Sequence, residues 1–318
     1  VGDLAGAGRT TETVKGNADA LAAHKSDGAS HSKTARFVVG TSTAGWTLED
    51  CDYLCDGTDD QEEIIQALND LPATGGEVVI LDGTYNITAS INIPEDNVSI
   101  RGNGNATILK RMYNSTTYEG VITLTSRSGC KIADLQVDGN KTSYSSSYNH
   151  SIYLSNSSNN TVTNNTCNND SYGICLNSSS NNTVIGNTCN NNRNGIYLSS
   201  SGSNNTVTNN ICNNNSNYGI YLNSLSNSIV TNNICNNNSN YGIYLTNSSN
   251  NTVTNNTCNN DSYGIYLSSS SNDNTVTGNT CNNNSSNGIY LSSSSNNTVT
   301  GNTCNNNNNG IYLSSSSN

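Results

Sequence analysis

The sequence predicts an all-β protein, a right-handed parallel β-helix of about ten rungs with 22–24 residues per rung. The isoleucine of a GIYL-like motif returns every 22–24 residues, at Ile152, Ile174, Ile196, Ile220, Ile243, Ile265, Ile289 and Ile311. In each unit a valine and a cysteine follow, always five residues apart. Four charged residues lie between Ile152 and Asn318, so composition alone would indicate disorder. The strict period overrules that interpretation, and the handedness follows from the crossover preference of parallel strands.

Each repeat unit is expected to bury four side chains on two short strands. In GIYL the isoleucine and leucine share one face of a strand, while the tyrosine points to the other face. In TVT only the valine is apolar, and the Asn, Gly and Ser residues in between are typical of turns. Rungs stacked about 4.8 Å apart would align these side chains in ladders. The cysteine ladder is predicted at Cys167, Cys189, Cys212, Cys235, Cys258, Cys281 and Cys304.

The 11 cysteines are interpreted mainly as buried thiols that fill core space. Ladder neighbours would lie close enough for a disulfide, but their side chains would point in parallel into the core. A metal site needs clustered ligands, with a histidine or a second cysteine in each unit. No metal and no cofactor are therefore predicted. Cys51 and Cys55, in CDYLCDG, remain open between a local disulfide, a metal pair and free thiols.

One rung of the predicted array contains an insertion. Ile122, Leu124, Ile132 and Val137 occupy the Ile, Leu, Val and Cys positions of an earlier unit. Val137 is followed by the next repeat isoleucine after 15 residues, where other units take 7 or 8. This difference predicts an extra loop of about eight residues within 139–150.

Three segments are expected along the chain. Residues 1–36 are predicted to form a helical leader or stalk linker, since Val14, Ala18 and Leu21 have heptad spacing; an unstructured leader is the alternative. Residues 37–77 are predicted to hold a strand and a helix over 61–71, capped by Asp59 or Asp60, which covers the open end of the solenoid. Residues 78–318 form the β-helix, with regular repeats from residue 152.

Two motifs resemble known families. The stretch DGTDDQEEIIQAL…GGEVVILDGTYNI resembles the start of the pectate-lyase-3-like β-helix superfamily, which includes polysaccharide-degrading enzymes and phage tailspikes. The NNTVTGNTCNNNSNYGIYL units resemble Asn-rich parallel β-helix repeats, including those of periplasmic copper-maturation proteins. The leader is similar to linkers of phage tail fibres, which implies a homotrimer and a virion or other attachment partner at the N-terminus. The catalytic motifs of the enzyme families match no stretch of this chain.

Candidate site residues fall into two groups. The clearest acidic group is Asp134 and Asp138, close to Lys141 and His150 beside the predicted loop; its carboxylates are weak candidates for catalysis. Asp170 and Asp261 lie in matching NNDSYGI motifs and are interpreted as turn residues. Outward tyrosines either stabilise the sheet by stacking or bind sugar faces. The glycan-binding candidates are Tyr153, Tyr197, Tyr221, Tyr244, Tyr266, Tyr290, Tyr312, Lys141, Tyr144, Tyr148 and His150.

The leading hypothesis is a non-catalytic tail-fibre or tailspike-like protein, on a virion tail or the cell surface, that binds cell-surface polysaccharide. A net charge of -11 argues against nucleic acid and anionic membranes as partners. A polysaccharide lyase or glycoside hydrolase acting near Asp134 and Asp138 is one alternative. A structural spacer or adhesin repeat is another. Ice binding by the Thr-x-Thr rows is a fourth and disfavoured hypothesis, because threonine is also a common strand residue.

Overall fold

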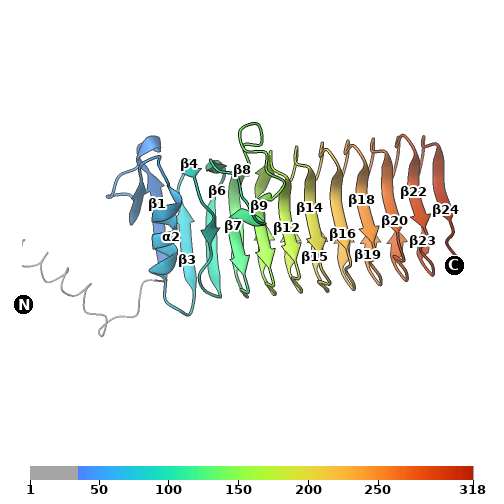
Figure 1. Cartoon of the computed structure of the whole chain (residues 1–318), viewed down its shortest axis with the longest axis horizontal. Coiled ribbons are helices and arrows are strands. Elements are labelled where there is room, and N and C mark those ends of the chain that lie inside the picture. The colour runs from blue at the N-terminus through green and yellow to red at the C-terminus, as the bar shows by residue number, and fades with distance from the viewer. Residues whose placement is uncertain (1–34, 318) are drawn as a thin grey trace, which may run out of the picture.

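Residues 35–317 of the computed structural model form an elongated solenoid (Figure 1). Within this range the strands make two long sheets, of 14 and 10 strands, in which every pairing is parallel. The 10-stranded sheet contributes one strand to each rung, so the predicted right-handed parallel β-helix of about ten rungs is confirmed. The predicted leader, with its heptad and trimer contacts, lies almost wholly outside the described residues and stays a prediction.

The larger sheet contains β1 (Arg36–Thr41), β2 (Tyr53–Cys55), β3 (Gly76–Ile80), β4 (Gly83–Ile87), β6 (Val98–Arg111), β8 (Lys131–Asp138), β10 (Thr161–Thr163), β11 (Thr166–Asn168), β13 (Thr183–Ile185), β15 (Thr206–Thr208), β17 (Ile229–Thr231), β19 (Thr252–Thr254), β21 (Thr275–Thr277) and β23 (Thr298–Thr300). The smaller sheet contains β5 (Ile91–Asn92), β7 (Glu119–Thr125), β9 (Asn149–Ser155), β12 (Tyr172–Asn177), β14 (Asn194–Ser199), β16 (Tyr218–Asn223), β18 (Tyr241–Thr246), β20 (Tyr263–Ser268), β22 (Asn287–Ser292) and β24 (Asn309–Ser314).

A helix covers the N-terminal end of the solenoid. This helix, α2 (Gln61–Asn69), buries Ile64, Ala67 and Leu68 against the first strands and follows the short 3₁₀ helix η1 (Ser42–Ala44). It ends two residues earlier than predicted because its last turn tightens before Pro72, which has no backbone N–H to donate. The side chain of Asp60 does not cap the helix. Its carboxylate instead accepts backbone N–H groups from Gly57 and Asn86, at 2.7 and 2.6 Å.

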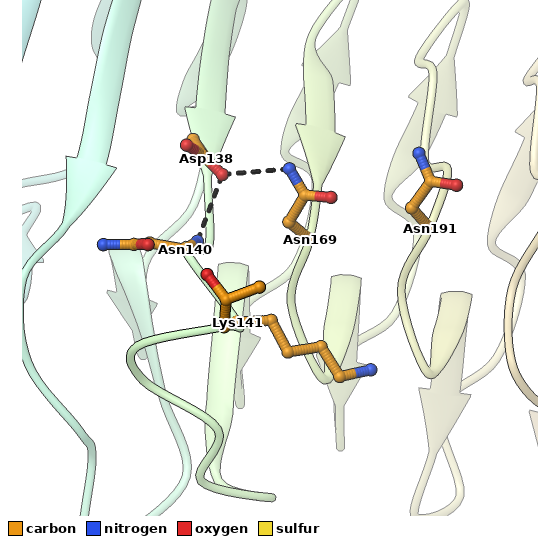
Figure 2. Close-up of a pocket in the computed structure, with 6 residues that line it drawn as sticks. Asp138, Asn140, Lys141, Asn169 and Asn191 are labelled. Carbon is orange, nitrogen blue, oxygen red and sulfur yellow. Dashed lines mark hydrogen bonds between the residues drawn. The ribbon is translucent and has the colours of Figure 1, made fainter.

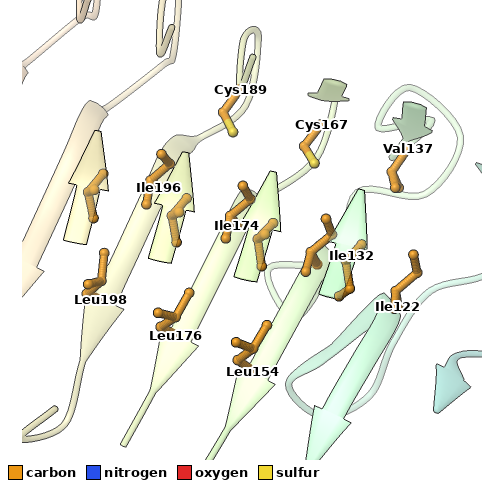
Figure 3. Close-up of a cluster of buried hydrophobic side chains, with 14 of the residues drawn as sticks. Ile122, Ile132, Val137, Leu154, Cys167, Ile174, Leu176, Cys189, Ile196 and Leu198 are labelled. Carbon is orange, nitrogen blue, oxygen red and sulfur yellow. The ribbon is translucent and has the colours of Figure 1, made fainter. Parts of the chain in front are cut away.

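The core consists of side chains aligned from rung to rung. Strand pairing places Ile122 beside Ile152 and Ile132 beside Val162, which confirms the predicted alignment of the earlier, irregular unit. Figure 3 shows the isoleucine, leucine and cysteine side chains of successive rungs pointing into one interior. The repeat cysteines from Cys167 to Cys281 are fully buried there, and Cys304 is half-buried. Among residues 35–317, no helix is long and apolar enough to cross a membrane.

Paired asparagines turn the chain at the corners of each rung. The first asparagine of a pair, such as Asn164 or Asn232, adopts a left-handed backbone, with φ of 55° and 56°. The second, such as Asn165 or Asn233, points inward and is almost fully buried. Its Oδ1 accepts the backbone N–H of the equivalent residue on the preceding rung, and its Nδ2 donates to a carbonyl deeper in the stack. Buried amide columns therefore satisfy the polar backbone at the corners, where no strand partner is available.

Removing one amide from a column is expected to destabilise the array. Asn233 Oδ1 accepts from the backbone N–H and Nδ2 of Asn210, and its Nδ2 donates to Val207 O at 2.9 Å. We expect Asn233→Ala to lower the free energy of unfolding by about 3 kcal/mol, since buried donors and acceptors lose their partners. Thermal and urea unfolding followed by circular dichroism measure this. The neighbouring Asn232→Gly, which suits the left-handed backbone, is the control; equal losses in both variants would contradict the prediction.

Candidate functional site

The predicted insertion forms a loop, residues 139–148, between β8 and β9. In Figure 1 it projects beside the otherwise regular rungs. Backbone hydrogen bonds anchor its start to the next rung: Gly139 N–H donates to Asn168 O at 2.9 Å, and Lys141 N–H donates to Asn169 O at 3.0 Å. Near its end, the Ser146 hydroxyl donates to Ser115 O at 2.8 Å. The loop is thus held against the rungs on both sides.

A polar cavity of about 350 Å³ lies at the base of this loop. Its lining combines a carboxylate, an ammonium group, a hydroxyl and amides, from Asp138, Asn140, Lys141, Thr142, Asn169 and Asn191. Asp138 Oδ1 accepts from the backbone N–H of Asn140 and from Asn169 Nδ2, both at 3.1 Å. Figure 2 shows these residues on neighbouring rungs, with the Lys141 side chain extending toward the rung that carries Asn169. Donors and acceptors thus line one open cavity.

The structure separates the two acidic candidates. Asp138 lines the cavity, whereas Asp134 does not. Asp134 has a left-handed backbone within β8, with φ of 52°, and its Oδ1 accepts from Asn164 Nδ2 at 3.1 Å. The cavity therefore presents one carboxylate beside one ammonium group. This donor and acceptor set suits hydrogen bonding to hydroxyl groups.

A buried charged cluster supports the rungs on either side of the loop. Arg111 and Asp170 have fully buried side chains, with 3.6 Å between Nε and Oδ2. The guanidinium also donates to Ser115 Oγ at 3.2 Å and to the backbone carbonyl of His150. Burial raises the pKa of Asp170, and the positive charge of Arg111 counteracts that rise. Asp170 is therefore more than the turn residue predicted: it is the counter-charge of an arginine that holds the start of β9.

His150 does not join the cavity surface. Its side chain is fully buried, and neither ring nitrogen has a hydrogen-bond partner. Burial, together with the nearby Arg111 charge, lowers the pKa of His150 to about 3. The imidazole packs against Tyr118, with ring centroids 5.6 Å apart, and against Tyr172, at 4.7 Å. Because no part of the ring is exposed, it acts here as a neutral aromatic core residue.

The outward tyrosines of the smaller sheet stack along the solenoid. Their ring centroids are 4.7–5.3 Å apart, in the column Tyr197, Tyr221, Tyr244, Tyr266, Tyr290 and Tyr312. The rings inside the column are half-buried, and Tyr312, on the last rung, is 45% exposed. Tyr153 stands apart and is nearly buried, because Cys175 interrupts the column. The column therefore offers ring edges and hydroxyls along one face.

The remaining loop candidates lie beside the cavity without lining it. Tyr148 is 40% exposed and packs edge-on against Tyr118, with ring centroids 5.0 Å apart. Tyr144 is half-buried, and its backbone N–H donates to Asn140 O at 3.0 Å. Sequence reasoning missed Tyr118 and the lining residues Asn140, Thr142, Asn169 and Asn191. The asparagines share the polar corner pattern of many others, so only their distance from the loop could have marked them.

Cys51 and Cys55 are free thiols rather than a disulfide. The Cys51 thiol donates to Thr47 O at 3.2 Å, and the Cys55 thiol donates to Asp60 O at 3.5 Å. Ligand atoms of Cys55, Asp60 and Glu63 lie within 4.8 Å of one another. Burial raises the pKa of all three groups, and both oxygens of Asp60 already accept backbone N–H groups. These contacts explain the cluster as a hydrogen-bonded brace between the helix start and β4.

Comparison with solved structures places the fold among phage and carbohydrate-active β-helices. ORF18 of Geobacillus virus E2 is 15% identical with a TM-score of 0.69, over 98% of this chain and 65% of that one. The Dettilon tailspike protein (gp208) is 17% identical with a TM-score of 0.68, over 82% of this chain and 57% of that one. A DFA-IIIase from Arthrobacter chlorophenolicus A6 is 13% identical with a TM-score of 0.65, over 83% and 78%. The chain thus spans about 60% of the length of the two viral proteins.

The sequence comparisons agree with the repeat architecture. No curated protein matches the chain. The family described as periplasmic copper-binding protein (NosD) matches residues 91–283 and 235–318, which together include the whole regular array. The predicted resemblance to Asn-rich β-helix repeat proteins and to tailspikes is therefore confirmed. The chain belongs to the NosD family of parallel β-helix proteins.

Proposed function

We propose that this chain is a non-catalytic, tailspike-like surface protein that binds polysaccharide at the base of the inserted loop and along the adjoining face. The observation that carries the proposal is the polar cavity of about 350 Å³ between Asp138, Lys141 and the corner amides. Its mixed donors and acceptors match the hydroxyl groups of a sugar chain. The similarity to a tailspike supports this assignment through shared architecture. The same similarity supports a location on a virion tail or outside the cell.

The carboxylate arrangement supports binding rather than hydrolysis. Hydrolysis of a glycosidic bond by the common mechanism uses two carboxyl groups on either side of that bond. Within the described residues the cavity is lined by a single carboxylate, that of Asp138. Asp134, the second predicted acid, is hydrogen-bonded to Asn164 away from the cavity lining. Asp138 and Lys141 are therefore assigned to hydrogen bonding with a bound sugar.

The copper-binding description of the family does not fit the donors found in residues 35–317. Copper sites favour imidazole, thiolate and thioether ligands. The single described imidazole, His150, is fully buried beside the positive charge of Arg111. The fully buried repeat cysteines pack among isoleucine and valine side chains, which leave no imidazole beside them. The Cys55 cluster combines one thiol with two carboxyl groups that brace the helix start. We therefore assign copper no role in this part of the chain.

Lys141→Ala is expected to weaken binding to the recognised polysaccharide about tenfold, because it removes an ammonium donor from the cavity. Full-length protein is first applied to an array of bacterial capsular and cell-wall polysaccharides, and affinities for the bound one are then measured by calorimetry. Lys131→Ala is the matched control, since it removes the same charge from an exposed position at the start of β8. Sedimentation of the same sample tests the predicted trimer.

Two results would contradict the proposed function. Absence of binding to every polysaccharide by the intact protein would overturn polysaccharide recognition. Release of reducing or unsaturated sugar ends, lost in Asp138→Ala, would instead establish the enzyme alternative. Equal affinity of wild type and Lys141→Ala would place recognition outside the cavity.

A further inference from the structure

The tyrosine column on the smaller sheet is interrupted at one rung. Strand register aligns Tyr153, Cys175 and Tyr197 at the same outward position on β9, β12 and β14. Every later rung has a tyrosine at this position. Tyr153 and Tyr197 are thus two rungs apart, about 9.6 Å at the usual strand spacing. Successive rings in the column need about half that distance, so one ring is missing between them.

A separate cavity of about 150 Å³ occupies the place of the missing ring. We call it the ring slot, and its lining is Tyr118, Tyr153, Cys175, Asn177, Tyr197, Ser199 and Ser200. Cys175 is 3% exposed and forms the floor. Below the slot, the Tyr172 ring stacks on Tyr197, at 5.3 Å, and meets His150, at 4.7 Å. These contacts hold the aromatic wall in place without filling the slot.

The two ends of the slot differ in polarity. Aromatic rings form the walls, and the amide of Asn177 with the hydroxyls of Ser199 and Ser200 forms the polar end. Asn177 Nδ2 donates to Tyr153 Oη at 3.4 Å, and Ser199 Oγ donates to Asn177 Oδ1 at 3.2 Å. None of the lining residues is charged. A ligand for this slot must therefore be one ring in size, with a flat apolar face, polar substituents and no net charge.

We infer that the ring slot binds a single neutral pyranose unit of the polysaccharide, sandwiched between Tyr153 and Tyr197; this inference rests on the proposed carbohydrate function. The C–H face of a pyranose packs against aromatic rings, and its hydroxyls reach the Asn177 and Ser199 side chains. The volume admits one sugar ring, which assigns the slot a side branch or chain end. An acidic sugar is disfavoured, because the slot offers no cation and the chain has a net charge of -11.

The test uses saturation-transfer NMR on the full chain with methyl glycosides of glucose, galactose and N-acetylglucosamine, and with methyl glucuronide and p-cresol for comparison. At least one neutral glycoside is expected to bind. Cys175→Tyr should abolish that signal, because it restores the side chain that the repeat places on the other rungs and so fills the slot. Cys175→Ser, which keeps the slot open, should bind like the wild type.

A second pair of variants tests the walls. Tyr197→Leu should weaken the neutral glycoside about tenfold by removing a stacking surface, while Tyr266→Leu, at the same position three rungs away, should not. Unchanged binding in Cys175→Tyr, binding of p-cresol alone, or preference for the glucuronide would overturn the inference. Failure of the slot leaves the Lys141-dependent polysaccharide affinity intact, so the two proposals are distinguishable.

Discussion

Replacing Arg111 by methionine is expected to lower the free energy of unfolding by about 4 kcal/mol at neutral pH. Removing one partner of a buried ion pair leaves the other charge uncompensated, which typically costs about 3–5 kcal/mol. Here Asp170 would lose its guanidinium partner while its side chain stays fully buried. The pKa of Asp170, already raised by burial, would rise further because Arg111 now opposes that rise.

The same substitution removes the contacts that join three segments. The guanidinium lies 4.5 Å from the centre of the Tyr113 ring and donates to Ser115 Oγ and to His150 O. These partners belong to the strand connection after β6 and to the start of β9, where the inserted loop rejoins the array. We therefore expect faster amide hydrogen exchange at residues 139–150 than in the wild type, in addition to the global loss of stability.

The double variant Arg111→Met/Asp170→Asn separates the charge effect from the packing effect. Asp170 starts a column that continues with Asn192, Asn215 and Asn238, so an asparagine matches the amides of the following rungs. Replacing both members of a buried ion pair by neutral residues is often close to neutral in stability. Thermal and denaturant unfolding should thus show the double variant regaining part of the lost stability. A double variant less stable than Arg111→Met alone would contradict this account.

The regular part of the fold could be predicted because its signal is local and repeated. Isoleucine, leucine and valine recur at constant spacing, and stacking identical rungs has one solution that buries all of them. The inserted loop was predicted for the same reason, since 15 residues stand where other units take 7 or 8. The buried amide columns were not predicted. Both members of an Asn-Asn pair are equally polar, and only the left-handed backbone of the first turns the second inward.

The candidate site was predicted in position but not in composition. Asp138 and Lys141 were found because the loop interrupts the repeat, and both line the cavity. Arg111 escaped notice because β6 pairs with β8 through two register shifts, so no fixed spacing shows that its side chain points inward. Its partner Asp170 lies on a later rung, and stacking of the rungs brings the two together. The ring slot likewise depends on the register of three strands rather than on any single motif.

Asp261→Asn is expected to have the opposite sign and to raise the free energy of unfolding by about 4 kcal/mol at pH 7. Asp261 occupies the same amide column as Asp170, between Asn238 and Asn284, but no arginine contacts it among residues 35–317. It is 3% exposed, its Oδ1 accepts from Asn238, and its Oδ2 has no partner. Burial raises its pKa from 3.8 to about 8.

The pH dependence follows from this direction. A carboxyl group whose pKa is higher in the folded state binds its proton more tightly there, so its contribution is fully present below the unfolded pKa, near pH 4. As the pH rises from about 4 to about 8, the wild type loses about 1.4 kcal/mol per pH unit through this group, and above pH 8 the loss is constant. The variant has no proton to lose, so the two proteins should differ little at pH 4 and most above pH 8.

The gain of the variant also has a structural source. On the next rung, Asn284 Nδ2 donates to Cys258 O at 3.1 Å, and Asn307 Nδ2 repeats this contact with Cys281 O at 2.7 Å. An amide at position 261 would make the equivalent bond to Cys235 O, which an ionised carboxylate can only repel. Unfolding midpoints of wild type and variant at pH 4–9 measure the difference, in which the raised pKa values of Asp60 and Glu63 cancel. A difference that does not change with pH would refute the assignment of an ionising, unpaired acid to this column.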